Sequence, residues 1–250
     1  MNNLGYGYRN ARKKGQLSKE DMKNRLKWCK EKKKANVTQE FWNRGVSLYM
    51  DGTGFVFKEN AFDQAKSVKS KVWRRPDEGL ERGCTAKLNK AGTVQAKFMV
   101  GISYERGVVL CEHYTGLTGK KFSKMMDQCI PRAFDWSINP TDRRYLQDGC
   151  PVQNSRIAQE ILEDLGAELV SIPARSPDLN PIENFFHLVG QKLEQGAITN
   201  NITHQTFDEF VARVTDIILN FDRNIINKII GNMDTRIQEV IKKKGGRTKY

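Results

Sequence analysis

Helix-like and strand-like patterns of hydrophobic residues alternate along this chain of 250 residues. The first clear pattern is helical and runs from Ser18 to about Lys34, with Ser18 and Asp21 in the spacing of a capping box. The apolar runs that predict strands after it are 46–50, 55–57, 97–103, 107–114 and 144–147. The chain is therefore expected to open with a helix and to continue into a sheet.

The second half of the chain mixes helices with short strands. Glu105-Arg106-Gly107 separates two strand-like runs and indicates a hairpin turn, while residues 120–133 have helical spacing. Pro151 is placed to open a further helix that Gly166 ends, and 167–172 is the next strand-like run. Helical patterns then continue to the end. This alternation predicts an α/β sheet with helical cover.

The composition is that of a globular protein with a large positive charge. Hydrophobic residues make up 38% of the chain, enough for a substantial core, and the formal net charge is +13. No stretch reaches the roughly 18 apolar residues needed to span a bilayer, and the polar start lacks the apolar segment of a secretory signal. We expect a soluble intracellular protein with no membrane partner and no small-molecule cofactor.

The positive charge is concentrated at the two ends. Residues 1–44 hold thirteen Lys and Arg against four Asp and Glu, and a second basic run closes the chain within 231–250. Either run alone is typical of a solvated helix face or tail. Two runs flanking a core that carries candidate acidic residues favour binding to a phosphate backbone, because bound Lys and Arg release condensed counterions. The expected partner is DNA, bound in a salt-sensitive way.

The pattern of cysteine and histidine residues does not favour a zinc site or a nucleophilic catalytic site. The five cysteines are far apart and form no CxxC pair, so buried or free thiols are expected. The three histidines support no histidine-based nucleophilic mechanism. The candidate chemistry is therefore carried by carboxylates.

Three acidic residues stand at the ends of apolar segments: Asp51 in VSLYMDGTGF, Asp148 in YLQDGCPVQNS and Glu183 in SPDLNPIENFF. Each has a structural alternative. Asp51-Gly52 suits a type I′ hairpin turn, Asp148-Gly149 suits a strand-to-helix turn, and Glu183 is placed like a capping-box glutamate. Taken singly, none of the three indicates chemistry.

Their combination favours a metal site. Carboxylates from two strands and a nearby helix N-terminus can converge on one point, and hard oxygen ligands suit Mg²⁺ or Mn²⁺. Two such ions about 3.5–4 Å apart activate a water or a 3′-hydroxyl and stabilise the leaving oxygen of a phosphodiester. The expected cofactor is therefore two Mg²⁺ or Mn²⁺ ions per active site.

At these residues the sequence resembles the catalytic domain of DDE transposases of the Tc/mariner superfamily. The resemblance covers roughly Leu4 to Arg223 and is most specific in VWRRP (72–76), LQDGCPVQNS (146–155) and IPARSPDLNPIEN (172–184). Thirty-four residues lie between Asp148 and Glu183, a spacing that matches the Tc-like branch. The resemblance implies DNA strand cleavage and strand transfer.

The resemblance also implies a ribonuclease-H-like mixed sheet flanked by helices, with Asp51, Asp148 and Glu183 as catalytic and metal-binding residues. Asp51 would lie on the central first strand, Asp148 at the end of the fourth strand, and Glu183 on a helix. This conflicts with a hairpin turn at Asp51, so we expect one extended strand through Asp51, with Gly52 and Gly54 leaving room for substrate.

The domain organisation implied by the resemblance has three parts: a basic helical linker over 1–44, the catalytic domain over 45–230, and a basic tail over 231–250. Residues 58–96 would form a loop insertion used in assembly on DNA. The residues expected to contact DNA are Arg12, Lys13, Lys14, Trp73, Arg74, Arg75 and Arg175. For Arg175, a plain surface role is equally compatible with the sequence.

The segment SPDLNPIEN has its own physical logic. Its prolines restrict the approach to a helix that Asn180 is placed to cap, and Asn184 is expected to hydrogen-bond locally. One face of this helix predicts a buried stripe formed by Ile182, Phe185, Phe186, Val189 and Leu193. Glu183 would thereby be held beside the core.

Two departures from the family pattern matter. Gly149 and Gln153 stand where many relatives have Asn and His, and Gln153 cannot act as an acid or base near neutral pH. The start of the chain looks like the tail of a helix-turn-helix domain and the linker after it. A recognition domain for transposon ends is therefore expected to be largely missing.

Three functions are open from the sequence. The first is a transposase catalytic domain acting in the nucleus of a eukaryotic host, as a homodimer on transposon ends and target DNA. The second is a catalytically silent or domesticated DNA-binding derivative of a transposase. The third is a nuclease of the same fold acting on RNA–DNA hybrids, against which SPDLNPIEN argues.

Overall fold

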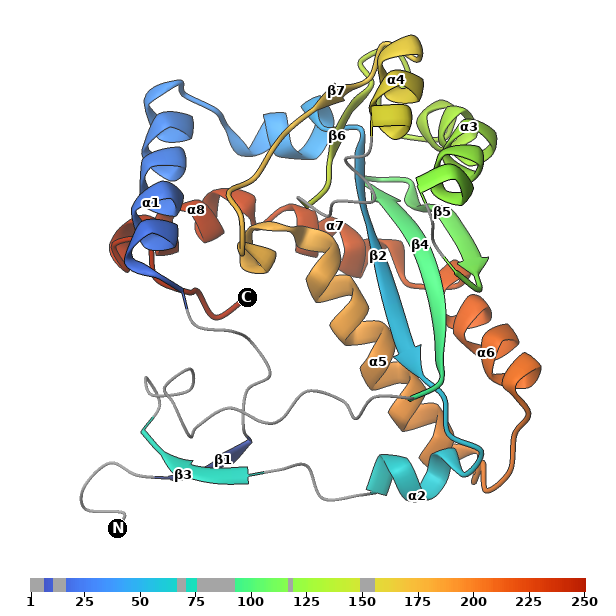
Figure 1. Cartoon of the computed structure of the whole chain (residues 1–250). Coiled ribbons are helices and arrows are strands. Elements are labelled where there is room, and N and C mark those ends of the chain that lie inside the picture. Colours follow the sequence, from blue (N-terminus) through green and yellow to red (C-terminus); the bar gives the residue numbers. More distant parts are fainter. Residues whose placement is uncertain (1–6, 11–16, 67–70, 76–92, 117–118, 149–155) are drawn as a thin grey trace.

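The central feature of the computed structural model is a five-stranded sheet (Figure 1). The structure describes residues 7–10, 17–66, 71–75, 93–116, 119–148 and 156–250. The strands lie in the order β5-β4-β2-β6-β7. Their bounds are β2 (Leu48–Val56), β4 (Gln95–Ser103), β5 (Gly107–Tyr114), β6 (Arg144–Leu146) and β7 (Glu168–Leu169). β2 pairs antiparallel with β4 and parallel with β6, which makes it the junction of the mixed sheet.

β2 runs unbroken through Asp51. Asp51 pairs with Val100 of β4, and Gly54 further along pairs with Lys97. The ladder therefore continues across the Asp-Gly step, where a hairpin turn would have ended it. The prediction of one extended strand through Asp51 is confirmed, and the hairpin alternative is wrong.

The expected β4–β5 hairpin is also confirmed. β4 pairs antiparallel with β5 through a register that ends at Ser103 opposite Gly107. Two residues near this turn have positive φ, Glu105 at 57° and Gly107 at 82°. Because glycine adopts such angles without a steric penalty, the placement of Gly107 explains why the chain reverses at this point.

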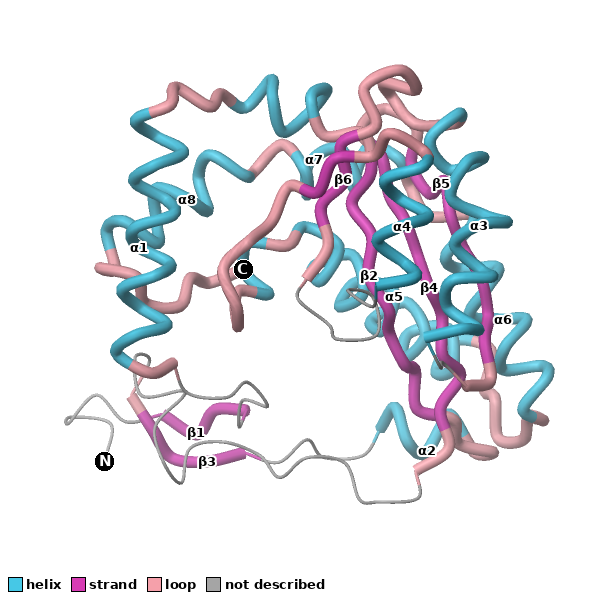
Figure 2. The backbone as a smooth tube through the Cα atoms, turned by 45° about the horizontal axis from the view of Figure 1, so that its top comes forward, coloured by secondary structure: helices cyan, strands magenta, loops and turns pink. Residues whose placement is uncertain are grey.

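The pleat of β2 sends alternate side chains to opposite faces of the sheet. Leu48 and Met50 pack in the cluster that includes Ile130 and Phe134 of α3 (Gly119–Asp135) and Leu162 of α4 (Arg156–Asp164). Figure 2 shows α3 and α4 in front of the strands.

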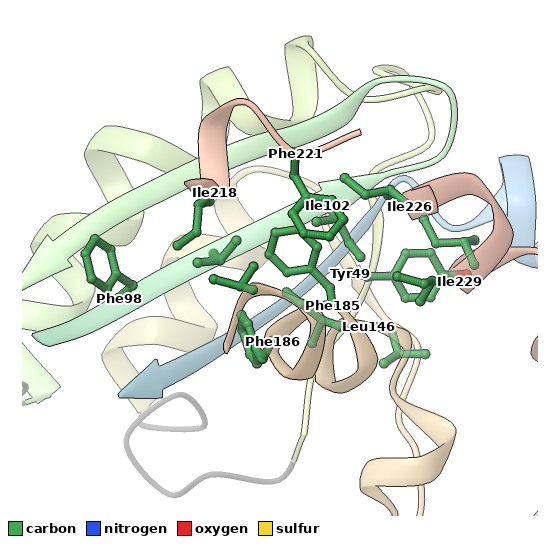
Figure 3. Close-up of a cluster of buried hydrophobic side chains, with 14 of the residues drawn as sticks. Tyr49, Phe98, Ile102, Leu146, Phe185, Phe186, Ile218, Phe221, Ile226 and Ile229 are labelled. Carbon is green, nitrogen blue, oxygen red and sulfur yellow. The ribbon is translucent and has the colours of Figure 1, made fainter. Parts of the chain in front are cut away.

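Tyr49 belongs to the cluster on the other face, with residues of α5 (Pro181–Thr199), α6 (Phe207–Leu219) and α7 (Arg223–Ile230) (Figure 3). Asp51 lies two residues after Tyr49 on β2, so its side chain points to the same face of the sheet, towards α5.

α5 carries the apolar stripe predicted for it. Phe185 is fully buried, and its ring meets that of Phe221 edge to face with centroids 4.8 Å apart. None of the residues in the stripe is more than 8% exposed; they are Ile182, Phe185, Phe186, Val189 and Leu193. This burial fixes the rotation of α5 and so the direction in which its remaining residues point.

The N-terminal helix and the C-terminal end of the chain pack together. α1 (Lys19–Lys34) opens with the predicted capping box of Ser18 and Asp21, and α8 (Met233–Lys242) lies beside it (Figure 1). Gly245 has a φ of +90°, and a Cβ placed on it would lie 1.9 Å from the Met22 carbonyl oxygen. The last residues are therefore folded against α1, and Thr248 is 4% exposed. A π-helix over Phe41–Gly45 leads from this region towards β2.

The loop insertion expected over 58–96 contains structure of its own. It includes α2 (Ala61–Lys66) and β3 (Lys71–Arg74), and β3 pairs antiparallel with β1 (Gly7–Asn10) in a separate two-stranded sheet. Tyr8 stands opposite Trp73 in this register. The insertion is therefore tied to the segment that precedes α1.

One predicted element differs from the one observed, and the start of another is not among the residues that the structure describes. The strand expected over 167–172 is only β7, because its two residues are exposed at the sheet edge and β6 itself has only three residues to pair with. Helix α4 is described from Arg156, so the predicted start at Pro151 lies outside the described residues. Across the described ranges, no helix is both long and apolar enough to cross a bilayer.

Candidate active site

Asp51 is the most enclosed of the three candidate carboxylates. It is 6% exposed in the centre of the sheet, and its Oδ1 accepts a hydrogen bond of 2.7 Å from the Gly52 N–H. Its Oδ2 accepts a hydrogen bond of 3.3 Å from Nδ2 of Asn180. A buried carboxylate depends on such donors, since burying an unpaired charge is costly. The two oxygens are therefore held from two directions.

Asp148 lies at a level of the sheet that matches the position of Asp51. In the parallel pairing of β2 with β6, Tyr49 stands opposite Leu146. Asp51 and Asp148 each lie two residues beyond that pair, in the same chain direction. Asp148 is half-buried and follows the end of β6, as expected. Neighbouring parallel strands thus bring the two aspartates to matched positions.

Glu183 lies in the first turn of α5. Pro181 occupies the first helical position, as predicted, and the Glu183 N–H donates to the Asn180 carbonyl at 3.2 Å. Glu183 is half-buried, between the buried neighbours Ile182 and Phe185. A carboxylate there is favoured by the positive end of the helix dipole. Because Asn180 contacts Asp51, this end of α5 stands beside β2.

Asn180 has a different role from the one expected. The prediction that its side chain caps α5 is wrong: it occupies the N-cap position, but the amide donates to Asp51 rather than accepting from the first turn. Asn180 is fully buried, and its Oδ1 finds no hydrogen-bond partner among the described residues. Sequence reasoning missed this contact because the two residues are 129 positions apart.

A buried ion pair supports the loop that leads into α5. Asp178 is 0% exposed and accepts two hydrogen bonds from Arg25 of α1, at 2.8 and 2.7 Å. Its Oδ2 also accepts from the N–H and hydroxyl of Thr248. Burial tends to raise the pKa of Asp178, but the Arg25 and Thr248 donors outweigh it and the pKa is lowered from 3.8.

The second arginine of this region, Arg236 of α8, holds the same segment. Its Nη1 donates to the Asp178 carbonyl and to Oδ1 of Asn184, both at 3.0 Å. Asn184 thus bonds to α8, a contact well outside the local one expected for it. Burial lowers the pKa of Arg236 to about 10. Neither contact could be predicted from the sequence, because the two basic segments were expected to be solvated or to bind a phosphate backbone.

The site residues fit a hard divalent cation by donor type. Asp51, Asp148 and Glu183 offer carboxylate oxygens, and the open Oδ1 of Asn180 adds an amide oxygen, all of them ligands that Mg²⁺ and Mn²⁺ accept. Within the described part of the chain, however, no three His, Cys, Asp or Glu side chains are gathered closely enough to hold an ion. The three-carboxylate metal site therefore stays a prediction.

The expected DNA-contacting residues are spread over several elements. Arg175 is exposed, with a φ of 55°, and its Nη1 lies 3.2 Å from Oδ2 of Asp21. Arg75 is exposed just after β3, and Trp73 and Arg74 lie within that strand. The expected contacts at Arg12, Lys13 and Lys14 lie outside the described residues, as do Gly149 and Gln153. The DNA-contacting roles of all these residues stay predictions.

Comparison with known proteins identifies the fold and the family. The DDE superfamily endonuclease family matches residues 47–206, more than half of the chain. Among solved structures, the catalytic domain of Mos1 mariner transposase aligns with a TM-score of 0.69 at 14% identity, covering 94% of this chain and 99% of that one. The predicted ribonuclease-H-like mixed sheet flanked by helices is thereby confirmed.

Two curated relatives are transposases of nematodes. The Tcb2 transposase of Caenorhabditis briggsae is 31% identical over 117 residues, 46% of this chain and 41% of the relative. The Tc3 transposase of Caenorhabditis elegans is 28% identical over 109 residues, 44% of this chain and 32% of the relative. The matched stretch thus spans less than half of either relative. The chain belongs to the DDE superfamily endonuclease family.

Proposed function

We propose that this chain performs the DNA strand cleavage and strand transfer of a transposase, using a divalent metal. The observation that carries the proposal is the meeting of three elements. Asp51 on β2 and Asp148 just past the end of β6 lie at matched positions beside the parallel pairing of these strands. Glu183 lies in the first turn of the helix that begins after Asn180, which is hydrogen-bonded to Asp51. The transposase names of both curated relatives support the same activity.

The proposed cofactor is Mg²⁺ or Mn²⁺, two ions per site, with Asp51, Asp148 and Glu183 as ligands. Structures of the Mos1 transposase catalytic domain with Mg and with Mn support this choice. Bound between these carboxylates, such ions would activate the attacking oxygen and stabilise the leaving oxygen of a phosphodiester.

The protein's own contribution is to orient these carboxylates. Asp51 is buried and held by two donors, so it has one preferred orientation, whereas Asp148 and Glu183 are only half-buried. Asp51 would thus serve as the fixed ligand, and the other two would complete the site from the strand end and the helix. Two of the three proposed ligands lie on a strand and a helix, and Asp148 directly follows a strand, so regular elements supply the precision that such chemistry needs.

The proposed partners are transposon ends and target DNA. Mos1 structures with a transposon end and in a strand transfer complex support this choice for a protein of the same fold. Exposed lysines of α1, together with Arg75 and Arg175, supply positive charge for the phosphate backbone. We further propose that the chain acts as a homodimer on DNA and, in a eukaryotic host, in the nucleus. Light scattering of the protein with and without DNA tests the dimer, and fluorescent tagging tests the location.

The experiment that tests the activity is nicking of supercoiled DNA with Mg²⁺ or Mn²⁺. The variants are Asp51→Asn, Asp148→Asn and Glu183→Gln, which remove charge with little change of shape. A matched control is Asp208→Asn, which makes the same change at an exposed position in α6. The proposal expects metal-dependent nicking by the wild type and the control, and its loss in the other three variants.

Two results would contradict the proposal. Nicking that persists in all three site variants would remove the site assignment. Salt-sensitive DNA binding without any metal-dependent cleavage by the wild-type chain would instead support the silent DNA-binding derivative.

A further inference from the structure

The Asn180 amide occupies a position where its burial is costly. Asn180 is 0% exposed, and its Oδ1 has no hydrogen-bond partner within the described ranges. A buried acceptor left unpaired destabilises the folded protein, so an apolar residue of similar size would be expected here on stability grounds alone. Such a group in a native fold calls for a specific explanation.

Capping does not explain the amide. Asn180 stands at the N-cap of α5, but its side chain makes no capping bond within this described helix. The helix start is defined by other means: Pro181 has no N–H to satisfy, and the Glu183 N–H already bonds to the backbone carbonyl of residue 180. The first turn therefore forms without help from the amide.

The contact with Asp51 explains why an amide side chain is buried at position 180. The amide donates from Nδ2 to Oδ2 of Asp51 at 3.3 Å, while Oδ1 of Asp51 receives the Gly52 N–H at 2.7 Å. The Gly52 donor is local and belongs to the same strand as Asp51. The Asn180 donor comes from another element, and the two together define the carboxylate plane. The orientation of the Nδ2 is fixed by chemistry, since a carboxylate accepts only donors.

We infer that Asn180 is a positioning residue: it holds the Asp51 carboxylate in one orientation and so prepares it for metal binding. This inference rests on the proposed function. Hydrogen-bonded neighbours of metal ligands of this kind typically contribute 10–100-fold to metal affinity. Asn180 also ties the start of α5 to β2, so the same bond fixes how the helix that carries Glu183 approaches the sheet.

The test is Mn²⁺ binding by titration calorimetry, supported by the rise in Tm that saturating Mn²⁺ produces. The variants are Asn180→Leu, which keeps the volume but removes the donor, and Asn180→Ala, which removes both. The control is Asn200→Ala, an exposed residue of the same type at the other end of α5. Asp51→Asn is included to show whether the measured binding belongs to the proposed site.

We expect the wild type and Asn200→Ala to bind Mn²⁺ alike, and Asn180→Leu and Asn180→Ala to bind about 10–100-fold more weakly. Circular dichroism of all variants should match that of the wild type, and the Mn²⁺-induced rise in Tm should shrink only in the Asn180 variants and Asp51→Asn. A purely structural role would lower the Tm without Mn²⁺ while leaving the affinity unchanged.

The outcomes separate the inference from the proposed function. If Asp51→Asn abolishes Mn²⁺ binding but Asn180→Leu binds like the wild type, Asn180 is not a positioning residue and the proposed site stands. If Asp51→Asn binds Mn²⁺ like the wild type, the proposed metal site fails, and the inference fails with it. Should Asn180→Ala not fold, Asn180→Leu still decides the question.

Discussion

Arg25 and Asp178 form a buried ion pair that joins the first helix to the loop before α5, across 153 positions of sequence. Both side chains are 0% exposed, and two hydrogen bonds of 2.8 and 2.7 Å connect them. The Arg25 Nε also donates to the Gly245 carbonyl at 2.9 Å, which adds the C-terminal end to the same contact. One carboxylate therefore links three distant parts of the chain beside the candidate active site.

Removing one partner of this pair is expected to destabilise the fold strongly. Asp178→Ala leaves the Arg25 charge buried, and breaking a buried pair in this way costs about 3–5 kcal/mol. Urea denaturation measures the loss. The control is Glu31→Ala, which removes the partner of Lys27 in an exposed pair of 3.9 Å on the same helix and should change the free energy of unfolding by less than about 1 kcal/mol. Equal losses in the two variants would contradict a structural role for the buried pair.

The same carboxylate predicts a specific acid sensitivity. The pKa of Asp178 is lowered below 3.8 in the folded protein, so the unfolded chain takes up the proton first as the pH falls. The stabilisation from Asp178 is complete well above pH 3.8 and is lost as the pH falls through the lowered folded-state pKa.

Urea midpoints measured from neutral pH downward test this. The wild type should lose stability more steeply with acid than Asp178→Asn, whose side chain does not titrate. If the urea midpoints of the two proteins fell in parallel as the pH is lowered, Asp178 would contribute nothing to the loss of stability in acid.

The packing of the C-terminal end against α1 predicts a glycine requirement. Gly245→Ala would place a Cβ 1.9 Å from the Met22 carbonyl oxygen at a φ of +90°, so a loss of at least about 1 kcal/mol is expected. Gly196→Ala is the matched change inside α5, where a Cβ meets nothing within 4 Å among the described residues, and it should stabilise by roughly 0.5–1 kcal/mol. Chemical denaturation measures the free energy of unfolding of both variants. If Gly245→Ala left this free energy unchanged, the end of the chain would not be held against α1.

The aromatic core under α5 should dominate stability. Phe185 is fully buried against Phe221, so Phe185→Ala is expected to cost about 3–5 kcal/mol, because it removes buried area and leaves a cavity. Leu219→Ala, at a residue that is 58% exposed, is the control and should change stability by less than about 0.5 kcal/mol. Thermal unfolding distinguishes them. A small effect of Phe185→Ala would mean that α5 is not anchored through this stripe.

Local patterns predicted the elements well, because their causes are local. The capping box at Ser18, the turn before Gly107 and the apolar stripe of α5 each depend on residues a few positions apart. The strand through Asp51 needed the family resemblance, because Asp-Gly alone is equally typical of a hairpin. Pairing with β4 decides the matter, and pairing partners are not visible in a local pattern.

The contacts around the candidate site could not be predicted from local patterns either, because their partners are distant in sequence. Asn180 reads as a helix cap, and only the approach of β2 gives it a carboxylate to bond instead. Arg25 lies in a helix rich in lysine, within a basic run expected to be a solvated face or to bind a phosphate backbone, yet it is buried against Asp178. Both cases are buried polar groups whose partners come from distant elements. The sequence shows the residue types but not the partners that burial demands.

The proposed activity requires Asp51, Asp148 and Glu183 to bind a divalent metal together. Its most direct test is the anomalous difference density of Mn²⁺ in crystals of this chain. We predict a peak bordered by all three carboxylates, with Asp51 still bonded to Asn180 and with Asp148 and Glu183 at ligand distance. No such peak is expected in Asp51→Asn crystals grown identically. Mn²⁺ bound elsewhere, or bound without contact to Asp51, would contradict the account.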